Sequence, residues 1–136
     1  MDYFEKEFLR VRTNLYKSER KPFGTRDDLA NWFVGKLKEQ NLKCFYCETS
    51  ILDIEKLIDA KLLKVRKVKG DGCRGLVLEI DKNDETYIPD NCVLSCYYCN
   101  NDKSYTSEKE EYKQNFGENR GRYFAKLIFK LNTQTI

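Results

Sequence analysis

Residues 76–104 read LVLEIDKNDETYIPDNCVLSCYYCNNDKS and contain the clearest structural pattern in the chain. Its alternating start, residues 76–80, predicts a β-strand that ends at a carboxylate, Asp81. A loop with turn-forming Pro and Asp residues follows, and residues 92–95 predict a second short strand. The motif CYYC then leads into a helix near Asn100. The stretch therefore predicts a strand, a loop, a second strand and a helix, in that order.

The four cysteines in two Cys-x-x-Cys pairs predict a zinc site. These ligands are Cys44, Cys47, Cys96 and Cys99. Four thiolates in two short loops suit tetrahedral zinc and leave no position open for water, so the expected zinc is structural. The pairs lie farther apart than the roughly 15–20 residues of a simple zinc ribbon. We therefore expect the zinc to staple the rim of a hairpin that lies between them.

The flanking segments predict helices. Apolar residues recur at helical spacing in residues 2–17, 25–40, 51–63 and 123–131, and Thr25 with Asp28 resembles a capping box. Residues 64–69 alternate basic and apolar side chains and predict a strand. We expect one α+β domain, 1–136, with a helical N-terminal part (1–43), a zinc-bound core (44–104) and C-terminal helices (105–136).

Composition limits the class of protein. Hydrophobic residues make up 40% of the chain, enough for a small core that a cross-link would help to stabilise. No apolar run is long enough to span a membrane, and the N-terminus does not look like a signal peptide. We therefore expect an intracellular (cytoplasmic) protein with no membrane partner, in which cysteines serve as metal ligands rather than as disulfides.

Basic residues gather in one segment although the net charge is only +3. Residues 61–82 carry three acidic side chains and seven basic ones: Lys61, Lys64, Arg66, Lys67, Lys69, Arg74 and Lys82. Such a segment beside a metal site suits a polyanion such as nucleic acid. The alternative interpretation is an ordinary solvated surface.

The motifs CFYC (44–47), LEIDK (78–82) and NCVLSCYYCNNDK (91–103) together resemble the HNH, or ββα-metal, endonucleases. The resemblance covers residues 44 to about 104. It implies a small zinc-stapled ββα-metal (HNH-like) core with flanking N- and C-terminal helices. It also implies a divalent-metal-dependent DNA endonuclease, such as a restriction or mobile-element enzyme, that acts on double-stranded DNA with Mg²⁺ or Mn²⁺.

The resemblance implies a role for each matching position. Asp81 and Asn100 would bind the catalytic cation, and Asn91 would hold the loop between the strands. Oxygen ligands suit a hard cation, which can stabilise charge on the departing oxygen. The expected phosphate contacts are Lys82, Lys103 and Arg74, and the residues expected at the flanking backbone or base edges are Lys64, Arg66, Lys67 and Lys69.

The general base is the open question, because the chain contains no histidine. Lys82 stands where most of the family has histidine, and a lysine of ordinary pKa is protonated near neutrality. The motif Cys-x-Tyr-Cys resembles a rare-cutting branch of HNH restriction endonucleases and implies an active-site tyrosine, Tyr46. The alternative for Tyr46 is a packing role within the CFYC motif. Glu79, on the same strand face as Asp81, is a second candidate base.

Three functional interpretations follow from the sequence. The first is the endonuclease, which would need a homodimer to cut both strands of a palindrome; the terminal helices would supply either that interface or a monomer's core. The second is a catalytically degenerate zinc module that binds nucleic acid without cutting. The third is a protein–protein adaptor in which zinc only holds the fold.

Overall fold

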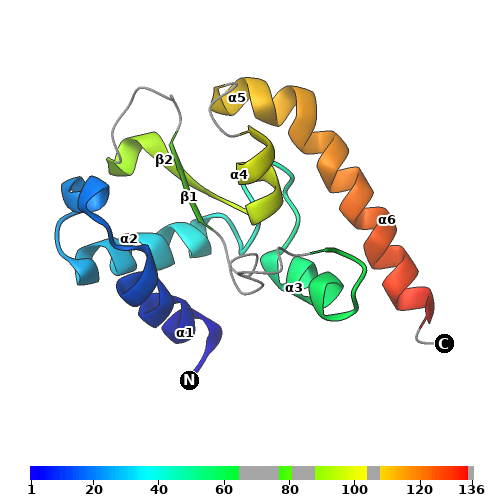
Figure 1. Ribbon diagram of the computed structural model, residues 1–136, viewed down its shortest axis with the longest axis horizontal. Helices are drawn as coiled ribbons and strands as arrows, with labels where there is room; N and C mark the ends of the chain where they lie inside the picture. The colour runs from blue at the N-terminus through cyan, green and yellow to red at the C-terminus, as the bar shows by residue number, and fades with distance from the viewer. Residues whose placement is uncertain (65–76, 81–87, 104–107, 135–136) are drawn as a thin grey trace.

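The computed structural model describes residues 1–64, 77–80, 88–103 and 108–134, with the backbone alone for 77–80 and 134. This part of the chain is mostly helical and contains one two-stranded sheet (Figure 1). The longer elements are α1 (Tyr3–Arg10), α2 (Arg26–Glu39), α3 (Ile51–Asp59), β1 (Val77–Ile80), β2 (Cys92–Ser95), α4 (Tyr97–Lys103), α5 (Lys109–Tyr112) and α6 (Glu118–Gln134). Short helical turns lie between them: η1 (Val11–Leu15), η2 (Ser18–Phe23), η4 (Pro89–Asn91) and η5 (Lys113–Gly117).

The two N-terminal helices begin at the residues that the sequence predicts. The Asp2 side chain accepts a hydrogen bond from the Glu5 amide at 2.8 Å and so caps α1. Thr25 and Asp28 form the predicted capping box of α2, each side chain accepting from the other residue's amide. The fully buried side chains of α2 recur about one turn apart and face the core: Leu29, Ala30, Phe33 and Leu37.

The predicted hairpin is confirmed where the structure describes it. Strands β1 and β2 pair antiparallel, with Val77 opposite Ser95 and Ile80 opposite Cys92. All of β2 is buried, including Cys92. The hairpin loop, 81–87, and the expected strand at 64–69 lie outside the described residues.

The Gln40 side chain, at the end of α2, fixes the position of β2. Its amide nitrogen donates to the carbonyl oxygen of Leu94 at 3.0 Å, and its amide oxygen accepts from the Leu94 amide at 3.1 Å. The amide of Phe45 also donates to the Leu94 carbonyl oxygen. Strand β2 therefore links the N-terminal helices to the first cysteine pair.

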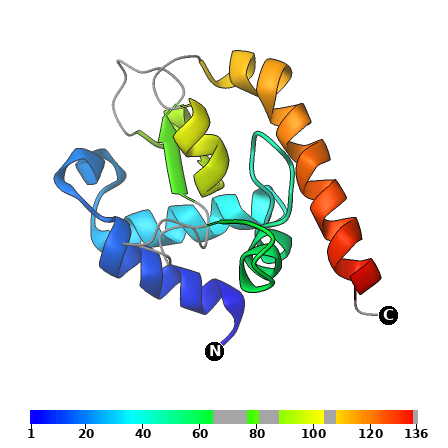
Figure 2. The same cartoon turned by 45° about the vertical axis from the view of Figure 1, so that its right-hand side comes forward.

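The C-terminal helix α6 runs along one side of the molecule and contacts α3 (Figures 1 and 2). It includes the predicted helix 123–131 and extends beyond it at both ends. Phe124 is its fully buried anchor, and its ring meets that of Tyr98 in α4 at 5.8 Å. Among the described residues, no helix has the length and apolar character needed to cross a membrane.

Candidate metal centre and neighbouring hairpin

The four predicted zinc ligands meet at one point. The sulfur atoms of Cys44, Cys47, Cys96 and Cys99 all lie within 4.8 Å of one another, and all four side chains are buried. Zinc–sulfur bonds of about 2.3 Å place tetrahedral sulfur ligands roughly 3.8 Å apart, so the cluster has the size and the donor set that zinc needs. Four sulfur ligands would fill the coordination shell of a bound zinc ion, so the cluster is compatible with a structural zinc site.

Local hydrogen bonds shape both cysteine pairs. The Cys44 amide donates to the Thr49 carbonyl oxygen at 3.0 Å, and the Glu48 amide donates back to the Cys44 carbonyl oxygen at 3.0 Å. Glu48 closes this turn with a positive φ of 57°. In the second pair, the Cys99 amide donates to the Cys96 sulfur at 3.4 Å, because α4 begins there. The backbone therefore turns the sulfur atoms inward in both pairs.

The thiol groups perturb one another strongly. Hydrogen bonds with Cys44 and then with the other thiols lower the pKa of Cys47 well below its ordinary value. Hydrogen bonds with Cys44 and Cys47, followed by burial, raise the pKa of Cys99 far above it. A bound divalent cation would displace the thiol protons and would hold all four ligands as thiolates.

Tyr46, the first candidate for the general base, is a packed core residue in this structure. Its side chain is 1% exposed, and its ring meets those of Phe45 at 5.3 Å and Tyr112 at 5.1 Å. Tyr112 in turn donates its hydroxyl to a carboxylate oxygen of Asp102 in α4 at 2.7 Å. This arrangement corresponds to the packing alternative for Tyr46.

Asn100 and Asn91 both take part in backbone hydrogen bonds. Asn100 follows the last cysteine on α4 and is partly buried. Its backbone N–H donates to the Cys96 carbonyl oxygen at 3.0 Å. Asn91 ends η4 immediately before β2, and its amide donates to the Ile88 carbonyl oxygen at 3.0 Å. Backbone hydrogen bonds therefore fix the main chain at both positions.

Only some of the remaining predicted residues lie within the part of the chain that the structure describes. The sequence predicts a phosphate contact for Lys103, but its side chain is fully buried and presents no ammonium group at the surface. Lys64 is exposed, and its carbonyl oxygen accepts from the Tyr98 hydroxyl at 2.8 Å. Glu79 pairs with Val93 through the strand register, while its side chain lies outside the described residues. The other predicted residues also lie outside them: Asp81, Lys82, Arg66, Lys67, Lys69 and Arg74.

Two glycines that the sequence analysis missed face the first cysteine pair. A β-carbon at position 117 would lie 2.3 Å from the Tyr46 carbonyl oxygen, and one at position 121 would lie 2.5 Å from that of Cys47. Contacts this close exclude any side chain at Gly117 and Gly121 without movement of the backbone. The available signal was two glycines four residues apart, on one face of a helical segment.

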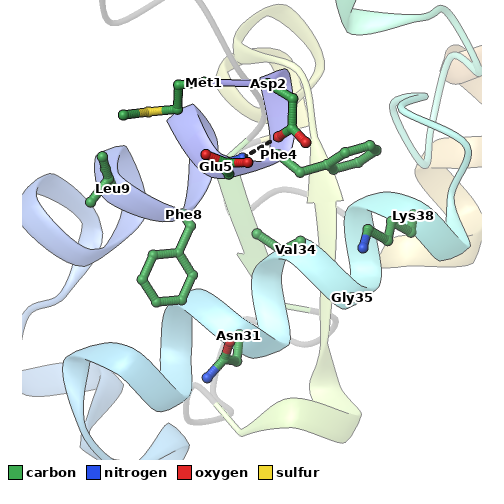
Figure 3. Close-up of a pocket in the computed structure, with 10 residues that line it drawn as sticks. All are labelled: Met1, Asp2, Phe4, Glu5, Phe8, Leu9, Asn31, Val34, Gly35 and Lys38. Carbon is green, nitrogen blue, oxygen red and sulfur yellow. Dashed lines mark hydrogen bonds between the residues drawn. The ribbon is translucent and has the colours of Figure 1, made fainter.

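A hollow of about 630 Å³ lies between α1 and α2, apart from the predicted site (Figure 3). Phe4, Phe8 and Val34 give it an apolar wall, and Lys38 lies on its α2 side. None of the residues that line it is among those predicted to bind metal or DNA. The hollow therefore belongs to the packing of the N-terminal helices rather than to the cysteine cluster.

Searches of protein-family models, of curated proteins and of solved structures with this chain find no match.

Proposed function

We propose that this protein is a divalent-metal-dependent DNA endonuclease of the HNH type, with a structural zinc ion held by its four clustered cysteines. The order of elements around the cluster supports the proposal most. An antiparallel hairpin is followed directly by α4, which contacts β1 and carries the last cysteine. In the sequence, Asp81 follows β1 and Asn100 follows Cys99. These are the two positions proposed to bind the catalytic cation.

The proposed chemistry needs little from the protein beyond positioning. One carboxylate oxygen from Asp81 and one amide oxygen from Asn100 suffice for Mg²⁺ or Mn²⁺, which keep several water ligands. The ion would stabilise the negative charge on the departing 3′ oxygen while water attacks phosphorus on the opposite side. The proton of that water passes to a base, and the phosphorus–oxygen bond to the leaving group breaks.

Glu79 becomes the stronger candidate for this base. Tyr46 is 1% exposed and packs against Tyr112, so water would reach its hydroxyl only after a rearrangement of the core. Glu79 lies two residues before Asp81, and the alternation of side chains along a strand would place both on one face. An ionised carboxylate can accept a proton at neutral pH, whereas a lysine such as Lys82 cannot.

A second function, DNA binding without cleavage, has two specific observations in its favour. The chain has no histidine, and Tyr46, which lies within the first cysteine pair, is buried. If Glu79 does not serve as the base, the site lacks a group to activate water. The protein would then be a catalytically degenerate zinc module that binds nucleic acid.

Cleavage assays with matched asparagine variants test the proposal. Supercoiled and linear double-stranded DNA would be incubated with zinc-loaded protein in Mg²⁺, in Mn²⁺ and in EDTA. We expect cleavage only with the divalent cation, and we expect Asn100→Ala to abolish it. The matched control is Asn101→Ala, at the exposed next position of α4. DNA binding without cutting in either metal would favour the second function.

Two further variants identify the base. Glu79→Gln should remove most of the cleavage rate without changing DNA affinity, because the amide cannot accept the proton. Tyr46→Phe should leave the rate intact if Tyr46 is a packing residue. The reverse pattern would return Tyr46 to the active site, as the restriction-enzyme resemblance implies.

A further inference from the structure

A basic hollow lies between η1, η2 and the start of α2. It has a volume of about 410 Å³ and is lined by Tyr16, Lys17, Ser18, Lys21 and Arg26. Three of these five residues are cations and none carries a carboxylate. The sequence around the hollow is also strongly basic. Residues 10–26 hold one acidic residue, Glu19, and six basic ones: Arg10, Arg12, Lys17, Arg20, Lys21 and Arg26.

Three of these six basic residues, Arg10, Arg12 and Arg20, form ion pairs or hydrogen bonds within the fold. Arg10 pairs with the buried Glu7 at 2.7 Å, and Arg12 pairs with Asp27 at 2.5 Å. Arg20 is buried and donates to the carbonyl oxygen of Leu15. These three side chains therefore already have partners within the fold.

The other three basic residues face the hollow and are exposed. Within the described part of the chain, Lys17, Lys21 and Arg26 form no ion pair. No carboxylate of the described residues therefore lies within ion-pair distance of these three cations. Three cations around one hollow raise the local concentration of anions.

The hollow is also partly pre-organised. The Arg26 guanidinium lies over the ring of Tyr16 at 5.2 Å and donates to the carbonyl oxygen of Arg12 at 3.0 Å. The Tyr16 hydroxyl donates to the carbonyl oxygen of Gly24 at 2.7 Å, which fixes the ring. These contacts hold Arg26 while leaving other N–H groups of its planar fork for a ligand. That fork matches the oxygen atoms of a phosphate group.

The hollow also lies near the hairpin. Phe23 at the end of η2 packs against Trp32 of α2 with the ring centroids 4.9 Å apart. On α2, Trp32 also lines a hollow together with Pro89 and Asp90 of η4, which leads into β2. Figures 1 and 2 show η2 and η4 on the same side of the molecule. A DNA strand held at the hairpin would therefore have this basic surface beside it.

We propose that the hollow lined by Lys17, Lys21 and Arg26 binds a backbone phosphate of the DNA that the hairpin engages. The inference rests on the proposed function and adds a second anchoring point to it, outside the zinc core. Such a contact would position the duplex without reading its sequence. An acidic peptide is the competing ligand, because the guanidinium fork pairs bidentately with a carboxylate as well as with a phosphate. The position of the hollow beside the hairpin proposed to engage DNA favours the phosphate.

The test measures DNA binding in the absence of catalytic metal. A short fluorescent DNA duplex is titrated with zinc-loaded protein without Mg²⁺, at several KCl concentrations between about 50 and 200 mM. The test variant is Lys17→Gln with Lys21→Gln. The matched control is Lys126→Gln with Lys130→Gln, which removes the same charge from exposed positions of α6.

We expect the test variant to lose about tenfold in affinity and the slope of log K against log salt to become shallower by about one unit for each lost phosphate contact. The α6 control should keep the wild-type slope. Thermal melting would confirm that both variants fold. Equal slopes for wild type and test variant would overturn the inference, as would tighter binding of a polyglutamate peptide than of DNA, or no DNA binding by the wild type.

Failure of this inference and failure of the proposed function are distinguishable. DNA binding that depends on Lys17 and Lys21 without any cleavage in Mg²⁺ or Mn²⁺ would support the phosphate site and reject the endonuclease. Metal-dependent cleavage with an unchanged salt slope in the test variant would support the endonuclease and reject the phosphate site.

Discussion

Gly121 of α6 lies so close to Cys47 that a β-carbon at position 121 would be 2.5 Å from the Cys47 carbonyl oxygen. Gly117, four residues earlier, stands in the same relationship to the carbonyl oxygen of Tyr46. The backbone at the start of the C-terminal helix therefore lies directly against the first cysteine pair. The metal centre and α6 depend on each other for their positions.

Gly121→Ala should destabilise the protein by about 1–3 kcal/mol, because the new methyl group overlaps a backbone carbonyl that cannot rotate away. Urea denaturation of the zinc-loaded protein would measure the change in free energy of unfolding. The matched control is Gly35→Ala in α2, where a β-carbon would meet nothing within 4 Å. That variant should gain up to about 1 kcal/mol from helix propensity. Equal effects at both positions would contradict the close approach.

The four-cysteine cluster should bind one zinc ion per chain and lose it together with its fold. Cys99→Ser should bind zinc more weakly and lower the melting temperature, because one thiolate ligand is replaced by a hydroxyl. Metal analysis of the purified protein and thermal melting with and without a chelator would measure both effects. Cys92→Ala is the matched control, since Cys92 is buried in β2 outside the cluster and should leave the zinc content unchanged.

The capping box of α2 should stabilise the protein only while Asp28 is ionised. Hydrogen bonds from the Thr25 amide and with its side chain lower the pKa of the Asp28 carboxyl. Because the pKa is lowered in the folded state, the stabilisation is complete above about pH 3.9, which is the ordinary pKa of aspartate. It is lost as the pH falls from there through the lower folded-state value. The stability advantage of wild type over Asp28→Asn should therefore shrink toward strongly acidic pH in urea titrations, whereas a constant difference would contradict this account.

Tyr112→Phe should cost about 1 kcal/mol, because it removes the hydrogen bond to Asp102 beneath the ring of Tyr46. Burial, followed by nearby negative charge, raises the pKa of the Tyr112 hydroxyl in the folded protein. The protonated form is therefore favoured by folding, and the stabilisation declines as the pH rises past about 10, the ordinary value for tyrosine. Chemical denaturation of both proteins at neutral and alkaline pH would test this. Tyr123→Phe at an exposed position of α6 is the control and should be neutral.

Features encoded by neighbouring residues could be predicted from the sequence. The capping box needs only Thr25 and Asp28, and each Cys-x-x-Cys pair contains its own turn. The two strands around Ile80 and Cys92 follow from short apolar runs on either side of turn-forming residues. Each of these signals lies within a few residues, so no knowledge of remote contacts was necessary.

Features that depend on remote segments could not be predicted in the same way. Tyr46 is buried because Tyr112, from a distant helix, packs on its ring. Lys103 matched a basic position of the family motif, yet the described fold encloses its side chain completely. The close approaches of Gly117 and Gly121 to the first cysteine pair, and the hydrogen bonds between Gln40 and Leu94, also join segments far apart in the chain. No local pattern reports such pairings.

The four-cysteine cluster also constrains the order in which the chain can fold as it leaves the ribosome. Cys44 and Cys47 emerge well before Cys96 and Cys99, so full coordination has to wait until the hairpin and α4 have been synthesised. The segment that carries Gly117 and Gly121 can pack against the first cysteine pair only after that. A translation product that stops short of Cys99 would hold three ligands at most, and stable retention of zinc would therefore mark chains whose synthesis had passed this point.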